Sequence, residues 1–406
     1  MNGERLNGWL AAMSEFGKNP AGGVTRLAYS DADLAARACT MRLMREAKLD
    51  VVVDAAGNIF GRRAGSDARE RPVIFGSHVD SVPDGGNYDG NVGTLAAIEV
   101  ARTLGEQGVA TRHPLWVACW QNEEGGTWGS HLVTAETTPA ERATVARSGT
   151  SIDDGIRALG GDPARLTTAR LRPGDVHGYL ELHIEQGGIL DRDHVDIGVV
   201  EGIVGLREWD VTIEGFANHA GTTPMSERRD ALLAAARFTE MVNRVVTAEP
   251  GRQVGTVGRI QAFPGAPNVV PGKVTCTLEL RDLDDRKIQR LYDVIVVESR
   301  QIGARNGTTF GFHEFVTHES ARCDERVHAL IGASARTLGL TTMSLPSGAG
   351  HDAQNLARIC PMGMIFIPSV AGISHSPREF SRAADITNGA NVLLGAVLAM
   401  DAVAWS

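Results

Sequence analysis

The spacing of apolar positions along the first 200 residues alternates between helix-like and strand-like periods. A capped periodic run over 34–49 and an Ala-rich periodic run over 92–104 each predict a helix. Short apolar segments that predict strands recur around these helices, at 51–53, 58–60, 72–75 and 115–120. Because the last of these is a continuous apolar run, typical of a strand buried on both faces, the order predicts a parallel α/β sheet.

The pattern changes after about residue 205. Apolar and polar residues now alternate, which predicts strands with one buried face, at 208–214, 255–263, 273–281 and 308–315. Helical periods at 228–246 and 284–302 separate them, and this order favours a small open-faced α+β domain. Helical and buried-strand periods return from 324, with a core strand at 364–367 and a final helix at 386–404. We therefore predict a discontinuous α/β domain with a mostly parallel sheet, residues 1–206 and 317–406, and an inserted α+β domain, residues 207–316.

Composition narrows the class of protein. The 406 residues are 43% hydrophobic and 22% charged, as in ordinary globular proteins, and a net charge of −9 without a basic run argues against a nucleic-acid partner. No apolar run reaches the roughly 18 residues needed to cross a bilayer, and the first residues lack the pattern of a signal peptide. Five scattered cysteines without a C-x-x-C pair fit free thiols. We expect a cytoplasmic protein without membrane contact.

Polar clusters follow the predicted buried strands, and sites in α/β sheets lie at the carboxyl ends of strands. The clusters are residues 76–81 with 85–90, residues 121–126 and residues 372–377, and the block 180–187 lies between them in the chain. Together they supply histidine, aspartate and glutamate. A mixed nitrogen and oxygen set suits Zn or Mn and not a thiolate site.

The carboxylates in these clusters offer distinct chemical roles. Asp89 can bridge two metal ions with its two oxygens, and Asp80 can accept the second ring N–H of His78 and orient that imidazole. Adjacent side chains on an extended backbone point in different directions, so one of Glu123 and Glu124 can bind metal while the other holds a water as general base. Two ions about 3.5–4 Å apart would activate that water and polarise a carbonyl.

Eight blocks of the chain closely resemble the hydantoinase/carbamoylase group of dinuclear-metal amidohydrolases, which are related to aminoacylases and glutamate carboxypeptidases. The blocks are G-S-H-V-D-S-V, G-G-N-Y-D-G, N-E-E-G, E-L-H-I-E-Q-G, N-H-A-G-T-T-P-M, P-N-V-V-P, S-G-A-G-H-D-A and G-I-S-H-S-P-R-E. The resemblance runs in order through nearly the whole chain. His183 stands where peptidase relatives often carry aspartate, which points to the carbamoylase branch.

The resemblance implies two divalent ions per chain, Zn or Mn, with Co or Ni also compatible. The ligands it implies are His78, Asp89 and His183 for one ion, and Asp89, Glu124 and His375 for the other. It implies that Glu123 is the general base and that Asp80 is the partner of His78.

The resemblance also implies that the inserted domain acts as a lid and joins two copies into a homodimer. His219 would then stabilise the oxyanion, and the substrate's amide and carboxylate would contact Gln186, Asn268 and Arg281. These roles suit the chemistry of the side chains. A histidine donor stabilises negative charge on a carbonyl oxygen, and a guanidinium group binds a carboxylate through two parallel hydrogen bonds.

The function these observations favour is hydrolysis of a linear C–N bond in an N-carbamoyl-L-amino acid or similar ureido acid. An allantoate amidohydrolase is the nearest alternative, and an aminoacylase or peptidase a more distant one. A catalytically inactive binding relative is disfavoured by the intact ligand set and base. The loop at 125–130 is shorter than its counterpart in carbamoylases and borders the substrate site, so it bears on substrate identity.

Overall fold

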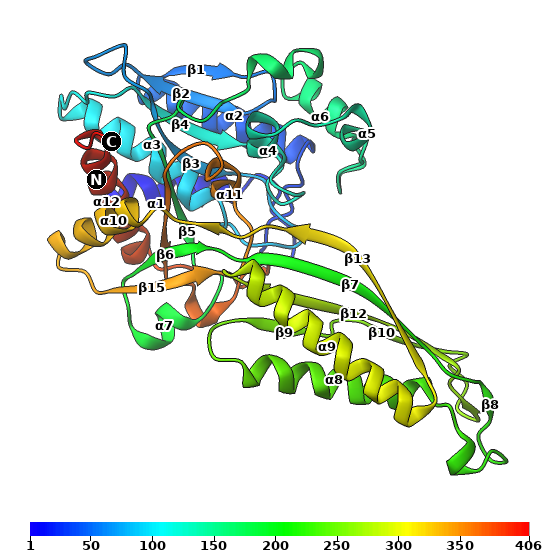
Figure 1. The fold of residues 1–406 in the computed structure, drawn as a ribbon. Coiled ribbons are helices and arrows are strands. Elements are labelled where there is room, and N and C mark those ends of the chain that lie inside the picture. The colour runs from blue at the N-terminus through cyan, green and yellow to red at the C-terminus, as the bar shows by residue number, and fades with distance from the viewer. Residues whose placement is uncertain (406) are drawn as a thin grey trace. The chain divides into compact units, whose positions relative to one another are not determined.

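The structure, a computed structural model, describes residues 1–405 in two compact units (Figure 1). The large unit comprises Met1–Gly202 and the chain from Arg322 onward, and the small unit is Ile203–Ala321. We describe each unit by itself.

A nine-stranded sheet forms the centre of the large unit, in the order β1-β2-β4-β3-β5-β16-β6-β14, with β15 paired to β6. Its strands are β1 (Asp50–Val53), β2 (Ile59–Arg63), β3 (Val73–His78), β4 (Leu115–Trp120), β5 (Gly178–Ile184), β6 (Ile197–Ile203), β14 (Ala321–Arg322), β15 (Thr342–Ser347) and β16 (Met362–Ile367). The neighbours β4, β3, β5 and β16 are parallel, whereas β1, β2 and β6 run antiparallel to their partners. The predicted parallel α/β core is therefore confirmed.

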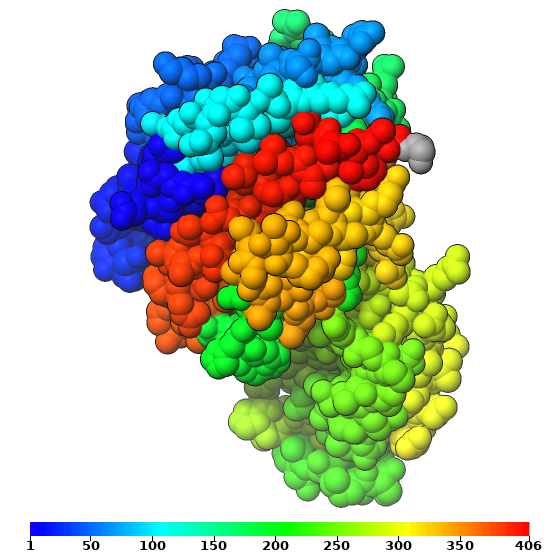
Figure 2. Space-filling model, turned by 90° about the vertical axis from the view of Figure 1, so that its left-hand side faces the viewer, coloured from blue at the N-terminus to red at the C-terminus, as the bar shows by residue number. Residues whose placement is uncertain are grey.

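Helices cover this sheet. They are α1 (Gly3–Met13), α2 (Asp31–Glu46), α3 (Asn91–Glu106), α4 (Trp128–Thr134), α5 (Pro139–Arg142), α6 (Ile152–Ala158), α7 (Ile189–Asp193), α10 (Glu325–Thr337), α11 (Asp352–Leu356) and α12 (Ala383–Asp401). The helices α3 and α12 pack against each other and on the central strands, and α10 packs on α12 and β16. Figure 2 shows them side by side as the cyan, red and orange bands of one face.

The helix α12 is the one described helix that is long and apolar enough, by length and mean hydropathy, to cross a membrane. It contains no continuous apolar run of the length considered above, since Asp385, Asn388 and Asn391 interrupt it. Eight of its residues are buried in this unit, and it contacts α1, α3, α10 and the sheet. Burial of this kind is what the core helix of a globular domain requires, and we interpret α12 as such a helix.

Most predicted elements of the large unit are present, but the strands β5, β6 and β15 and the helix α1 were not predicted. Ser30 caps the predicted helix by accepting from the backbone of Asp33, as its type and position indicate. The strand β5, at the centre of the sheet, was not predicted, although its segment E-L-H-I-E alternates polar and apolar residues as a half-buried strand does. Those side chains are buried all the same, since all seven positions of β5 are covered.

The small unit is an antiparallel sheet with two helices. Its main strands are β7 (Gly205–Glu214), β9 (Val254–Thr256), β10 (Ile260–Phe263), β12 (Lys273–Asp282) and β13 (Thr309–His318), in the order β10-β12-β7-β13 with β9 also on β12. The helices α8 (Ala231–Ala248) and α9 (Asp285–Asn306) pack on this sheet, and a short pair, β8 (Asn218–His219) and β11 (Val269–Val270), stands apart. Trp209, Val211 and Ile213 are buried on one face of β7, as their alternation predicted.

The single strand predicted over 255–263 is wrong in one respect, because the structure divides it into β9 and β10. Both pair with β12, and the break lies where Arg259 bonds to Thr277 through its own backbone N–H and carbonyl. A local irregularity of this kind depends on the facing strand and leaves no trace in the alternation.

Candidate metal centre

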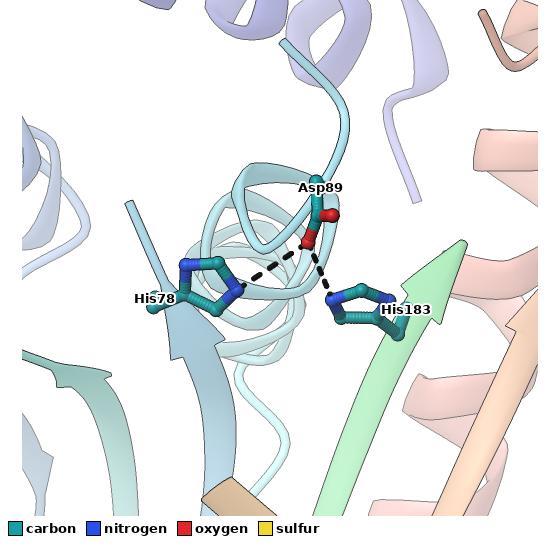
Figure 3. A group of neighbouring side chains, drawn as sticks. All are labelled: His78, Asp89 and His183. Carbon is teal, nitrogen blue, oxygen red and sulfur yellow. Dashed lines mark ion pairs between the residues drawn. The ribbon is translucent and has the colours of Figure 1, made fainter. Parts of the chain in front are cut away.

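The ends of the neighbouring parallel strands β3 and β5 each carry a buried histidine. His78 is the last residue of β3, His183 is next to last in β5, and both are 1% exposed. Asp89 lies in the loop directly before α3, and its carboxylate points between the two imidazoles (Figure 3). A Cβ at Gly90 would stand 2.4 Å from the His78 ring, so only glycine fits beside it. The three side chains meet at the carboxyl edge of the sheet.

Each oxygen of Asp89 faces a different set of side chains. Oδ1 lies 3.0 Å from His183 Nε2 and 3.5 Å from His78 Nε2. Oδ2 lies 3.2 Å from His375 Nε2, which is 3.6 Å from Glu124 Oε1. One carboxylate thus joins two groups of three candidate ligands, and within each group the ligand atoms lie within 4.8 Å of one another.

Backbone carbonyls set the protonation of the first two histidines. His183 Nδ1 lies 2.9 Å from the carbonyl oxygen of Ile184, and His78 Nδ1 lies 3.0 Å from that of Asp80. Because a carbonyl oxygen only accepts, each Nδ1 carries a proton, and each Nε2 is left to face Asp89. An Nε2 atom directed at this carboxylate calls for a positive charge between the two atoms, either a proton on the imidazole or a metal ion.

Two buried atoms of these groups have no hydrogen-bond partner among the described residues, His78 Nε2 and Glu124 Oε1. Buried polar atoms are rarely left unpaired, and such an atom calls for an explanation. A divalent ion in each group would engage both atoms, and imidazole nitrogens with carboxylate oxygens are ligands that Zn and Mn accept. The residues present therefore fit a pair of divalent ions.

The adjacent glutamates point to different groups, although they lie in a bend and a turn after β4 and not on the extended backbone that was assumed. Glu124 joins the group of Asp89 and His375, whereas Glu123 Oε2 lies 3.7 Å from His78 Nε2. Asp80 fixes the backbone of both glutamates, because its carboxylate accepts from the N–H groups of Glu123 at 3.2 Å and Glu124 at 3.1 Å. Its carboxylate lies 3.7 Å from His78 Nδ1, farther than its own carbonyl oxygen. The residue thus faces His78 chiefly through its backbone, while its side chain orients the glutamates.

The surroundings of the site shift the pKa values of its carboxyl groups in opposite directions. Burial raises the pKa of Glu123 well above its usual range, with the neighbouring Glu124 adding to the shift, and burial raises the pKa of Glu124 to about 7. Burial also disfavours charge on Asp89, but the imidazoles around it, His183 foremost, hold its pKa well below the usual range. Asp89 is therefore the fixed anion, whereas both glutamates take up a proton more readily than a free carboxyl group does.

Gln186 follows β5, and its side chain contacts the carboxylate of Asp89. Its side-chain Nε2 donates to Asp89 Oδ2 at 2.8 Å, and its backbone N–H donates to Ser369 Oγ at 3.0 Å. Its amide oxygen is buried and has no hydrogen-bond partner among residues 1–405. That oxygen can accept an N–H from a bound molecule.

The remaining predicted residues lie in the small unit. His219 is in β8 and Asn268 directly precedes β11, and both are exposed; the carbonyl oxygen of Asn268 accepts from the backbone of Ala220 at 2.9 Å. Arg281 lies near the other end of the unit, in β12, where its guanidinium makes a two-pronged pair with Glu279 at 2.8 and 3.1 Å. The structure thus brings His219 and Asn268 together and leaves Arg281 apart from them.

A third group of candidate ligands, not predicted, shares one residue with the first. Glu181, His183 and His351 lie with ligand atoms within 4.8 Å of one another. The Glu181 oxygens already accept from Ser77 Oγ at 2.8 Å, Tyr179 OH at 3.0 Å and a backbone N–H at 3.2 Å. With three hydrogen bonds already made, this carboxylate is better placed to orient its neighbours than to bind a metal ion. The motifs around residues 181 and 351 were visible in the sequence, but nothing there indicated that they meet.

Comparison with known proteins agrees with this geometry. Residues 74–399 match the model of the family described as peptidase family M20/M25/M40. An N-carbamoyl-L-amino acid amidohydrolase of Geobacillus stearothermophilus is 40% identical, with 97% of each chain covered, and an allantoate amidohydrolase of Escherichia coli (strain K12) is 34% identical, with 98% of this chain and 97% of that one covered. A solved amidase of the hydantoinase/carbamoylase family from Burkholderia multivorans is 36% identical and superposes with a TM-score of 0.91, covering 98% of both chains. The chain therefore belongs to the M20/M25/M40 peptidase family, and within it to the hydantoinase/carbamoylase amidohydrolases that its sequence resembles.

Proposed function

We propose that this protein hydrolyses the linear C–N bond of an N-carbamoyl-L-amino acid or a similar ureido acid. The chain is an amidohydrolase acting on C–N bonds other than peptide bonds, as are the relatives it matches over its whole length. The observation that carries the proposal is the pair of ligand groups sharing Asp89, with the Glu123 carboxylate 3.7 Å from His78. This is the arrangement that a hydrolase with two metal ions needs.

The proposed ligands are His78, Asp89 and His183 for one ion, and Asp89, Glu124 and His375 for the other. Two divalent ions held there would polarise the ureido carbonyl and make a water more acidic. Glu123 would accept the proton of that water and return it to the departing nitrogen, a role that its raised pKa suits. Asp80 would keep Glu123 oriented through the hydrogen bond to its backbone.

Gln186 is proposed to recognise the ureido group. Its buried, unpaired amide oxygen would accept an N–H of the terminal carbamoyl nitrogen, which neither an N-acetyl group nor a simple ester offers. A buried acceptor that is left unpaired by the wrong substrate discriminates strongly against it.

The three small-unit residues are proposed to complete the site, His219 as oxyanion donor, and Asn268 and Arg281 as substrate contacts. Arg281 is eight residues along β12 from Lys273, and β8 and β11 lie beyond the Lys273 end of that sheet. Eight residues of strand span about 26 Å, so His219 and Arg281 of one chain are too far apart to touch the same small substrate. This supports a homodimer in which His219 and Asn268 serve the site of the partner subunit.

Exposed apolar side chains on the small unit support such a homodimer. Ile260 and Phe263 are 51% and 38% exposed on β10, an edge strand of the sheet, and Leu232 and Leu233 are exposed at the start of α8. An apolar edge strand invites pairing with another chain. The five free cysteines, four of them buried, support the cytoplasm as the proposed location.

A product-release assay tests the proposed function. The protein, purified with Mn or Zn, is offered N-carbamoyl-L-amino acids, allantoate and N-acetyl amino acids, and release of ammonia or amino acid is followed. Turnover of the carbamoyl compounds above the others supports the proposal, and preference for allantoate assigns the alternative amidohydrolase. Turnover of N-acetyl compounds alone would contradict both, with a Glu123→Gln protein as the control for contaminating activity.

A further inference from the structure

A single buried carboxylate connects two loops that lie far apart in the chain. Glu379 is 5% exposed and stands between the loop before α3 and the loop after β16. One oxygen accepts from the backbone N–H groups of Tyr88 at 2.9 Å and Asp89 at 3.1 Å. The other accepts from Ser374 Oγ at 2.9 Å and from the backbone N–H of His375 at 3.3 Å. Both loops carry proposed metal ligands.

We propose that Glu379 is a positioning residue that holds Asp89 and His375 at the spacing required to bind the second ion. The inference rests on the proposed function, since it takes these two residues as ligands. It assigns a role to the end of the G-I-S-H-S-P-R-E block, which otherwise contributes only a histidine.

The loop after β16 needs such a restraint. His375 has a φ of +52°, in the left-handed region that costs a residue with a side chain about 1 kcal/mol or more. Its side chain is 48% exposed, against 1% for those of His78 and His183, so packing does little to fix it. The hydrogen bond from its backbone to Glu379 therefore falls where the ligand is least constrained by its surroundings.

The opposite loop is shaped to receive the same carboxylate. A Cβ added to Gly86 would stand 2.2 Å from Glu379 Oε1 and 2.4 Å from its Cβ, so the backbone reaches the glutamate only because residue 86 has no side chain. The contact is close-packed as well as hydrogen-bonded.

The four contacts also explain why the group must be a carboxylate. Three of them come from backbone N–H groups, which can only donate. Glutamine has nearly the same shape, but its NH₂ would confront at least one of these donors and lose that hydrogen bond. Glu379→Gln therefore removes the proposed restraint with little change in volume.

Cobalt(II) binding to the metal-free protein tests the inference without any substrate. We expect wild-type protein to bind about two ions, and Glu379→Gln to bind one of them at least about tenfold more weakly, as loss of a group that orients a ligand typically does. Adding metal should then restore turnover of Glu379→Gln, which a general folding defect would not allow.

A matched control is Asp54→Asn. The Asp54 carboxylate likewise accepts from backbone N–H groups, those of Ala56 and Asn58, but it does so in the turn between β1 and β2, where no ligand lies. This variant should bind both ions with wild-type affinity. Thermal unfolding of each metal-free protein, followed by circular dichroism, establishes that the variants are folded.

The outcomes separate the two proposals. Wild-type protein that binds no cobalt overturns the metal centre itself and the proposed function with it. If wild-type protein binds two ions and Glu379→Gln binds both equally well, the role of Glu379 is wrong while the proposed function stands. If Glu379→Gln does not fold, Ser374→Ala removes one of the four contacts, and unchanged cobalt affinity in that variant overturns the inference.

Discussion

At the scale of single residues, the site depends on which atom of each side chain faces which neighbour. Asp89 divides its two oxygens between two groups of candidate ligands, and the carbonyls behind His78 and His183 hold both imidazoles with Nε2 facing its carboxylate. Because the same carboxylate belongs to both groups, a single substitution should affect both ions.

Asp89→Ala should therefore lose both ions and not one. Metal content after dialysis, measured by mass spectrometry of the elements, should fall from about two per chain to well below one. Asp193→Ala is the control, since Asp193 is an exposed aspartate paired with Arg192 on the surface. Full metal content in Asp89→Ala would refute the shared ligand.

The two glutamates should differ in what they affect. Glu123→Gln should keep both ions and substrate affinity while lowering kcat by several orders of magnitude, because a glutamine cannot accept the proton. Glu124→Gln should instead weaken one ion, since Glu124 lies with Asp89 and His375. Metal titration and steady-state kinetics on both variants check this, and the reverse pattern would mean that the roles are exchanged.

At the scale of elements, stability depends on how helices are fastened to the sheet and to one another. The helix α1 packs on α3 and α12, and Arg5 in α1 ties it to α3. The Arg5 guanidinium bonds Glu99, whose carboxylate is fully buried, at 2.6 and 2.7 Å, and bonds the exposed Glu106 at 2.8 and 3.0 Å. Because the carboxylate of Glu99 is buried, this ion pair should contribute more to the stability of the fold than a surface ion pair does.

Arg5→Ala should destabilise the protein by about 3 kcal/mol, since removing one partner of a buried pair leaves an uncompensated charge. Arg42→Ala, which breaks the exposed pair of Arg42 and Glu46, should cost less than about 1 kcal/mol. Denaturant unfolding followed by circular dichroism compares them, and equal losses would contradict the assigned role of Glu99.

The pH dependence of this contact has a definite sign. Hydrogen bonding to Arg5 lowers the pKa of Glu106 from 4.5 to about 2. A lowered folded-state pKa stabilises the fold above the unfolded value, and the effect disappears as pH falls through the folded value. The contribution of Glu106 should therefore be constant from about pH 7 down to about 4.5 and vanish near pH 2, which unfolding of Glu106→Gln against wild type would measure.

At the scale of the whole molecule, the two units contribute different residues to the proposed site. The large unit holds both groups of candidate ligands and the proposed base, whereas the small unit holds His219, Asn268 and Arg281. Since His219 and Arg281 lie at opposite ends of the small unit, we infer that a complete site requires contributions from two chains.

Mixing two inactive variants tests this sharing. If His219 serves the partner's site, a hybrid of His219→Ala and Glu123→Gln chains contains one site with both defects and one intact site, so activity should reappear on mixing. If His219 serves its own chain, every site of the hybrid keeps one defect. Subunit exchange is verified separately by mass or fluorescence, and the absence of recovery despite exchange would exclude the shared site.

Much of the fold was determined by the sequence alone, because local periodicity records which face of an element is buried. The runs over 92–104 and 115–120 and the alternation in β7 were confirmed for this reason. The polar clusters at strand ends could also be recognised as candidate site residues, since a parallel sheet must bring its carboxyl ends to one edge.

What only the tertiary structure decided is contact between residues that are distant in the chain. The alternation in β5 does not reveal that both of its faces are buried, with Glu181 accepting from Ser77 of β3 and from Tyr179 of its own strand. The link from Glu379 to Asp89 spans 290 positions, and the distance between His219 and Arg281 follows from strand pairing in the small unit. Such contacts depend on how the elements pack, and packing is a property of the whole chain that the spacing of residues in any one segment does not record.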